Sequence, residues 1–124
     1  PSAPLYSHAI FDNVDQMTPI GASTNATVVS NTINPLPLVS VATSNRDMVI
    51  GAITAGESGT YTAQNGFTLG LTQSMTNPPG STALGIGYKT ANGSGETVSM
   101  LFNTANGSWI NRQAGLAIVL KVVN

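Results

Sequence analysis

The 124-residue chain contains no cysteine, and only 7% of its residues are charged, against roughly 25% in an ordinary domain. The absence of cysteine excludes a disulfide framework, thiolate catalysis and a thiolate metal site. Four Lys and Arg residues cannot form the basic surface that nucleic-acid binding requires, so no nucleic-acid partner is expected. The longest apolar run, Ala114 to Leu120, is far shorter than the roughly 18 residues of a membrane span.

Groups for catalysis are also scarce. His8 is the only histidine, and the five carboxylates are scattered singly. General acid–base catalysis needs two converging groups, and a zinc site normally needs three or four ligands. We therefore expect no enzyme activity, no catalytic residue, no transition-metal ligand and no cofactor. Calcium stays open, although Asp12 to Asp15 lacks the spacing of a calcium loop. Asp47 is expected to stabilise a turn, and Glu96 to face Lys89 across a hairpin.

Ser, Thr, Asn and Gly supply 52 of the 124 residues, and strong helix formers are few. Apolar runs of five to nine residues are instead bounded by Gly, Asn, Pro and Ser, which is typical of strands separated by turns. Asn-Gly pairs favour tight hairpins, and the chain has them at Asn65-Gly66, Asn92-Gly93 and Asn106-Gly107. This pattern predicts one all-β domain, an antiparallel β-sandwich or jelly roll of about seven to nine strands.

Several runs alternate with a period of two, which places one face on a core and the other in solvent. The residues expected in the core register are Phe67, Leu69, Leu71, Leu84, Ile86, Tyr88, Val98, Met100 and Phe102. Two further runs, Met48 to Ile53 and Leu116 to Leu120, are apolar on both faces. They are predicted to be central strands that are covered on both sides.

The N-terminal segment Ser7 to Asp15 aligns without gaps onto Gly115 to Val123 near the C-terminus. We therefore expect it to be the closing strand of a preceding copy. Residues 1–22 are expected to form a strand arm and connector, and residues 23–124 the sandwich core. The arm is predicted to pair through its main chain, either within its own copy or by strand exchange with a neighbour. The candidate self-association residues are Tyr6, Ala9, Ile10, Phe11 and Val14.

The segment Val14 to Ala22 resembles the "VDQTTPIGA" joint of tandem β-sandwich modules in secreted bacterial proteins and phage virion or tail proteins. Asn45 to Gly51 is similar to the "GDLVV" strand of these modules, and Tyr61 to Leu69 to their "GFTL" hairpin. Trp109, followed by Ala114 and Ala117, is similar to their closing strand. The resemblance carries no catalytic residue and implies a structural module on an extracellular or virion surface.

Two functions remain open at this point. The first is a non-catalytic subunit that self-assembles into a filament or decorates a capsid or tail, because small polar side chains lose little entropy on contact. The alternative is a carbohydrate-binding adhesion module, for which Tyr61 and Trp109 are the candidate glycan contacts. Three N-glycosylation sequons begin at Asn25, Asn92 and Asn106.

Overall fold

The computed structural model describes residues 8, 10–29, 34–36, 41–77, 80–105 and 112–123. These residues form seven strands and no helix. The strands are β1 (Ile20–Val28), β2 (Asn45–Ala55), β3 (Gly59–Ala63), β4 (Thr68–Asn77), β5 (Gly80–Asn92), β6 (Met100–Thr104) and β7 (Gln113–Leu120). The predicted all-β fold is confirmed, with a strand number at the lower end of the expected range.

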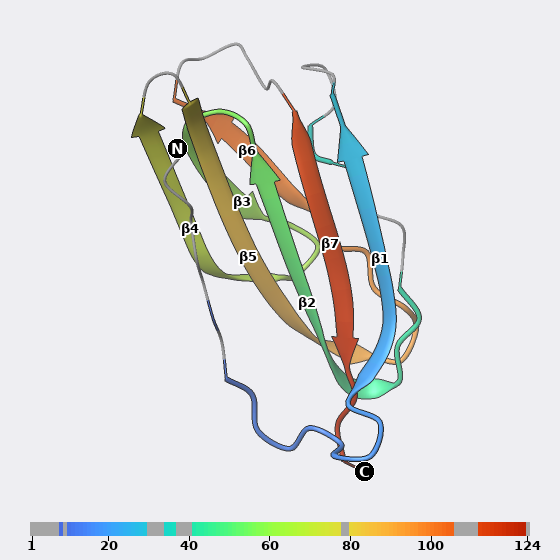
Figure 1. The fold of residues 1–124 in the computed structure, drawn as a ribbon. Helices are drawn as coiled ribbons and strands as arrows, with labels where there is room; N and C mark the ends of the chain where they lie inside the picture. Colours follow the sequence, from blue (N-terminus) through green and yellow to red (C-terminus); the bar gives the residue numbers. More distant parts are fainter. Residues whose placement is uncertain are drawn as a thin grey trace.

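The strands form two antiparallel sheets that pack face to face. Five strands make the large sheet, in the order β1-β7-β2-β5-β4, and β3 pairs with β6 in the small sheet. In Figure 1 the large sheet lies in front, and β3 and β6 lie behind it. β2 occupies the centre of the large sheet and β7 lies beside it, so both doubly apolar runs form interior strands as predicted.

The core between the sheets combines large side chains from the small sheet with small residues from the large sheet. Tyr61 of β3 and Phe102 of β6 are 2% and 3% exposed, and their ring centroids lie 5.0 Å apart. Opposite them, β5 presents Ala83, Gly85 and Gly87 to the core, and all three are buried. A Cβ atom on Gly85 would lie 2.7 Å from Tyr61, so a larger residue has no room there.

This packing reverses the orientation that we expected for β5. Its large residues Leu84, Ile86 and Tyr88 lie on the opposite face, and Tyr88 is 38% exposed. Alternation alone defines two faces and does not say which face is buried. The Tyr61 ring of the small sheet determines which face is buried, because it leaves no room for a side chain at Gly85.

The register of β4 also differs from strict alternation. The pairing of β4 with β5 is irregular between Leu69 and Leu71, where Gly70 is the additional residue. Such a bulge turns the residues beyond it to the other face. Phe67 and Leu69 therefore pack on the core, whereas Leu71 lies opposite Ile86 on the outer face. On β6 and just before it, Val98, Met100 and Phe102 are buried as predicted.

The N-terminal arm joins the C-terminal end of the same chain. Val14 and Val122 form an antiparallel bridge, and the Asp15 amide donates to the Lys121 carbonyl at 2.8 Å. β1 then begins at Ile20, inside the segment expected to be a connector, and pairs with β7. The expected limit between arm and sandwich at residue 22 is thus wrong, because hydrogen bonding to β7 recruits Ile20–Val28 into the sheet.

Candidate functional site

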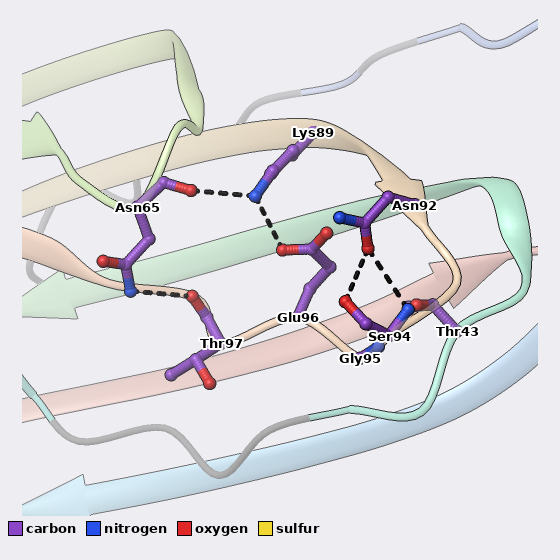
Figure 2. Close-up of polar contacts among 8 residues, drawn as sticks. All are labelled: Thr43, Asn65, Lys89, Asn92, Ser94, Gly95, Glu96 and Thr97. Carbon is purple, nitrogen blue, oxygen red and sulfur yellow. Dashed lines mark hydrogen bonds and ion pairs between the residues drawn. The ribbon is translucent and has the colours of Figure 1, made fainter.

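The most concentrated group of polar side chains lies where β5 approaches the segment before β6 (Figure 2). The Lys89 ammonium lies 2.7 Å from a carboxylate oxygen of Glu96 and donates to the Asn65 carbonyl at 3.0 Å. It also lies 5.8 Å from the centre of the Phe67 ring. The predicted pairing of Lys89 with Glu96 is therefore confirmed. The contacts of Lys89 with Glu96 and with the Asn65 carbonyl hold the Asn65-Gly66 turn against the edge of the core, which is a structural role.

Asp47 and Asp15 stabilise turns. The Asp47 carboxylate is buried and accepts the amides of Ser44 at 2.8 Å and Val122 at 3.4 Å, as its predicted turn role requires. The Asp15 carboxylate accepts the amides of Met17 at 2.8 Å and Thr18 at 3.1 Å. These backbone hydrogen bonds lower the pKa of Asp15 because they favour its charged form. Both carboxylates thus act on the backbone of their own chain.

Tyr61 does not present its ring to a ligand, so its candidacy as a glycan contact is wrong. The side chain is 2% exposed, and its hydroxyl donates to Gln113 Oε1 at 3.1 Å. Burial raises the pKa of this phenol because the phenolate would lose its hydration. The pattern of β3 did not reveal this, because a short strand before a Gly-rich loop can face either way. Trp109, the other candidate, lies outside the described residues.

The remaining candidate residues are spread over the molecule. Of the self-association candidates, Ile10 is 89% exposed, Phe11 and Val14 are half-buried, and Tyr6 and Ala9 lie outside the described residues. Among the sequons, Asn25 is exposed on β1. Asn92 is exposed and accepts the Ser94 hydroxyl at 2.6 Å, and Asn106 lies outside the described residues. The candidates that lie within the described residues are not brought together into one site.

Neither a metal cluster nor a catalytic pocket emerges from the described part of the chain. Its His, Asp and Glu residues do not gather in a group of three or more. An open depression of about 370 Å³ lies beside the polar contacts of Figure 2, and it holds no titratable side chain. Its lining residues are Val41, Ala42, Thr43, Gly93, Ser94 and Gly95.

The most prominent surface feature is the outer face of the large sheet, which sequence reasoning missed. The small sheet covers only the inner face, and none of the seven strands lies against the outer one (Figure 1). The outward residues of β2, β5 and β7 are mostly large and apolar: Met48, Ile50, Ala52, Leu84, Ile86, Tyr88, Leu116, Ile118 and Leu120. We call these nine residues the outer apolar face. Leu116, on β7 beside the β1 border, is 48% exposed.

The outer apolar face carries no charge and has a polar border along β1, where the outward residues are Ser23, Asn25 and Thr27. On β4 the outward residues alternate between polar Thr68 and Gln73 and apolar Leu71 and Met75. An apolar centre with an uncharged polar rim is the usual anatomy of a protein–protein interface. The sequence did indicate such a face. The runs within β2 and β7 that are apolar on both faces predicted strands that are covered on both sides.

Comparisons of the chain with known protein families, curated proteins and solved structures found no match. Among the described residues, no helix is long and apolar enough to cross a membrane. The fold is a two-sheet antiparallel β-sandwich in which none of the described strands covers the outer apolar face.

Proposed function

We propose that this protein is a non-catalytic structural subunit that self-assembles by packing the outer apolar face against the same face of a second copy. The observation that carries the proposal is that Leu116, Ile118 and their neighbours on β2 and β5 have no covering layer from the described chain. Soluble monomers rarely expose a continuous apolar patch of more than a few hundred Å².

The size of the large sheet suits a second copy. Strands lie about 4.8 Å apart and rise about 3.3 Å per residue, so the outer side of five strands of roughly eight residues, which is the outer apolar face together with its β1 and β4 borders, measures about 600 Å². Two such faces in contact would bury about 1,200 Å², which is the lower end of the range for stable, specific interfaces. A single extended segment would cover a width of about 5 Å, less than the three adjacent strands that carry the apolar side chains.

The chemistry of the face supports a contact between identical copies. The nine residues carry no charge, so a two-fold contact meets no repulsion between like charges. Two sheets that pack face to face also interdigitate their side chains at a separation of about 10 Å, as they do inside a sandwich. The carboxylates of Asp15 and Asp47 stabilise turns, and Glu96 pairs with Lys89, which supports a structural role over a catalytic one for these groups.

The place of this assembly is proposed from the sequence. The joint-like segment Val14 to Ala22 resembles that of modules in secreted bacterial proteins and in phage virion or tail proteins. We place the subunit on an extracellular or virion surface, as a filament subunit or as a capsid or tail decoration protein. The arm residues Asn13 to Asp15 bond to the C-terminal end of their own chain, which favours the outer apolar face over strand exchange as the main contact.

The test introduces a charge into the face. Leu116→Lys would place an unpaired ammonium within the contact, at a side chain that is 48% exposed in the single chain, and it should weaken association at least about tenfold, or 1.4 kcal/mol. Thr60→Lys adds the same charge at an exposed position of β3, away from the face, and should leave association unchanged. Light scattering over a concentration series measures the mass of each variant, and circular dichroism checks folding. A native chain that stays monomeric throughout, or a Leu116→Lys variant that assembles normally, would overturn the proposal.

A further inference from the structure

The outer apolar face gives a two-fold contact, but the large sheet has a second unpartnered feature, which is the free edge of β1. β1 ends the strand order, and in the described part of the chain no strand pairs with its outer side. An exposed strand edge presents unpaired amides and carbonyls, which can pair with another strand.

The other strand edges in the described part of the chain have contacts with neighbouring segments. At the opposite end of the large sheet, the Ser58 hydroxyl donates to the Met75 carbonyl of β4 at 3.0 Å. The amides of Gly59 and Tyr61, on the edge of β3, donate to Ser74 Oγ and Thr72 Oγ1 of β4 at 3.0 and 2.9 Å. On β6, the Asn34 side chain bonds both the amide and the carbonyl of Phe102, at 3.0 and 2.8 Å. The edge of β1 therefore differs from the other edges in having no such cover among the described residues.

β1 also lacks most of the features that protect natural edge strands. It has nine residues and contains neither a charged residue nor a proline. Its pairing with β7 is irregular only between Ile20 and Ser23, and it runs regularly from Ser23 to Val28. A regular, uncharged edge of this length is suited to strand addition.

We propose that β1 pairs antiparallel with β1 of a second copy, across a two-fold axis beside Asn25. The choice of a second copy as the occupant rests on the proposed function. A continuous sheet must place core-facing residues opposite core-facing residues, so the axis has to pass beside a residue and not between two. The regular run from Ser23 to Val28 is centred between Asn25 and Ala26, and we place the axis beside Asn25, the exposed residue of the two.

The residues that this register brings together are compatible. Asn25 meets Asn25, and Ser23 meets Thr27, on the exposed face. Thr24 meets Ala26 on the inner face, where Ala26 packs against the core. Every pair is small and uncharged, so the contact contains neither a clash between large side chains nor like charges. The result is a continuous ten-stranded sheet whose two outer apolar faces lie side by side.

The two contacts together determine the kind of assembly. Each is two-fold, one across the outer apolar face and one across the β1 edge. If the two axes intersect, the assembly closes at four chains, and if they do not, it continues as a filament. In this register the two Asn25 side chains lie side by side on the exposed face, so glycans on both would clash, and use of this sequon opposes pairing through β1.

The test uses the absence of native cysteine. Asn25→Cys places two thiols on the two-fold axis at a Cα separation of about 5 Å, within disulfide reach. Thr27→Cys is the matched control, because it is exposed on the same face of the same strand. Its thiol lies opposite residue 23, so the two Thr27→Cys thiols are about 13 Å apart, which is too far to bridge. After mild oxidation, Asn25→Cys should migrate as a two-chain species on a non-reducing gel, and Thr27→Cys as a single chain.

The outcomes separate this inference from the proposed function. If the native chain assembles by light scattering and Asn25→Cys cross-links while Thr27→Cys does not, the β1 contact is supported. If the chain assembles but Asn25→Cys stays reduced, or both variants cross-link equally, the β1 contact is overturned and the outer apolar face stands. A native chain that is monomeric at all concentrations, with no cross-linking, overturns both.

Discussion

The ring of Tyr61 in β3 lies directly on Gly85 in β5, so that a Cβ atom on Gly85 would come within 2.7 Å of the Cβ and Cγ atoms of Tyr61. This contact links the two sheets at the centre of the core. Because the ring occupies the inner side of β5, the large residues of that strand face outward. The close approach of Tyr61 to Gly85 therefore contributes to the outer apolar face.

Gly85→Ala should destabilise the fold through this contact. Overpacking of a close-packed core typically costs about 1–3 kcal/mol, and the Tyr61 ring has to shift to admit the methyl group. Gly87→Ala is the matched control, since it lies two residues away on the same strand and face, and its Cβ would meet nothing closer than 3.4 Å. Urea denaturation should show a lower free energy of unfolding for Gly85→Ala and little change for Gly87→Ala. Equal losses in both variants would contradict the predicted clash.

The buried phenol of Tyr61 makes stability depend on alkaline pH. Burial raises its pKa above the ordinary value of about 10, so the unfolded chain releases this proton at a lower pH than the folded chain does. The contribution is fully present below about pH 10 and is lost as the pH rises further. Tyr61→Phe cannot ionise, and its free energy of unfolding should fall less steeply between about pH 10 and 12. Denaturant titrations across this range measure both slopes, and parallel slopes would show that Tyr61 ionises equally in both states.

The Lys89–Glu96 pair should contribute measurable coupling energy. The Glu96 side chain is 7% exposed and that of Lys89 is 29% exposed, so the pair is shielded better than a surface salt bridge. Glu96→Gln removes one charge and leaves the Lys89 ammonium without its counter-ion, and it should cost about 1–3 kcal/mol. A double-mutant cycle with Lys89→Met isolates the pair from the other contacts of both residues. A coupling energy near zero would show that the 2.7 Å contact adds nothing to stability.

The Asp15 turn should weaken in acid. Hydrogen bonds from the amides of Met17 and Thr18 lower the pKa of Asp15, so its contribution is present above the unfolded value of about 4 and is lost as the pH falls through the folded value. Asp15→Asn should speed hydrogen exchange of these two amides at neutral pH. The difference from the native chain should vanish in acid, after correction for the intrinsic exchange rate. Asp12→Asn, an exposed carboxylate nearby, serves as the control and should leave both rates unchanged.

Predictions from the sequence were correct where a local residue pattern is compatible with only one structure. Alternation placed Val98, Met100 and Phe102 in the core, and the Asn65-Gly66 pair lies in a turn, where both residues have positive φ. They were wrong where the same residue pattern is compatible with two local structures. The bulge at Gly70 turned Leu71 outward, and β5 buried its glycines in place of Leu84. Neither result follows from residue spacing alone. The pattern of one strand carries no information about which side chains of the opposing sheet pack against it.

The all-β class, the turns, the central position of β2 and β7 and the scarcity of catalytic groups can all be predicted from residue composition or local periodicity. The same patterns indicate that β2 and β7 need cover on both faces. Which face of the large sheet the small sheet covers, and which face no described strand covers, depends on the packing of the folded chain. That choice depends on how Tyr61, Val98 and Met100 fit over Gly85, Gly51 and Gly87, and such a fit exists only once residues distant in the sequence are packed together.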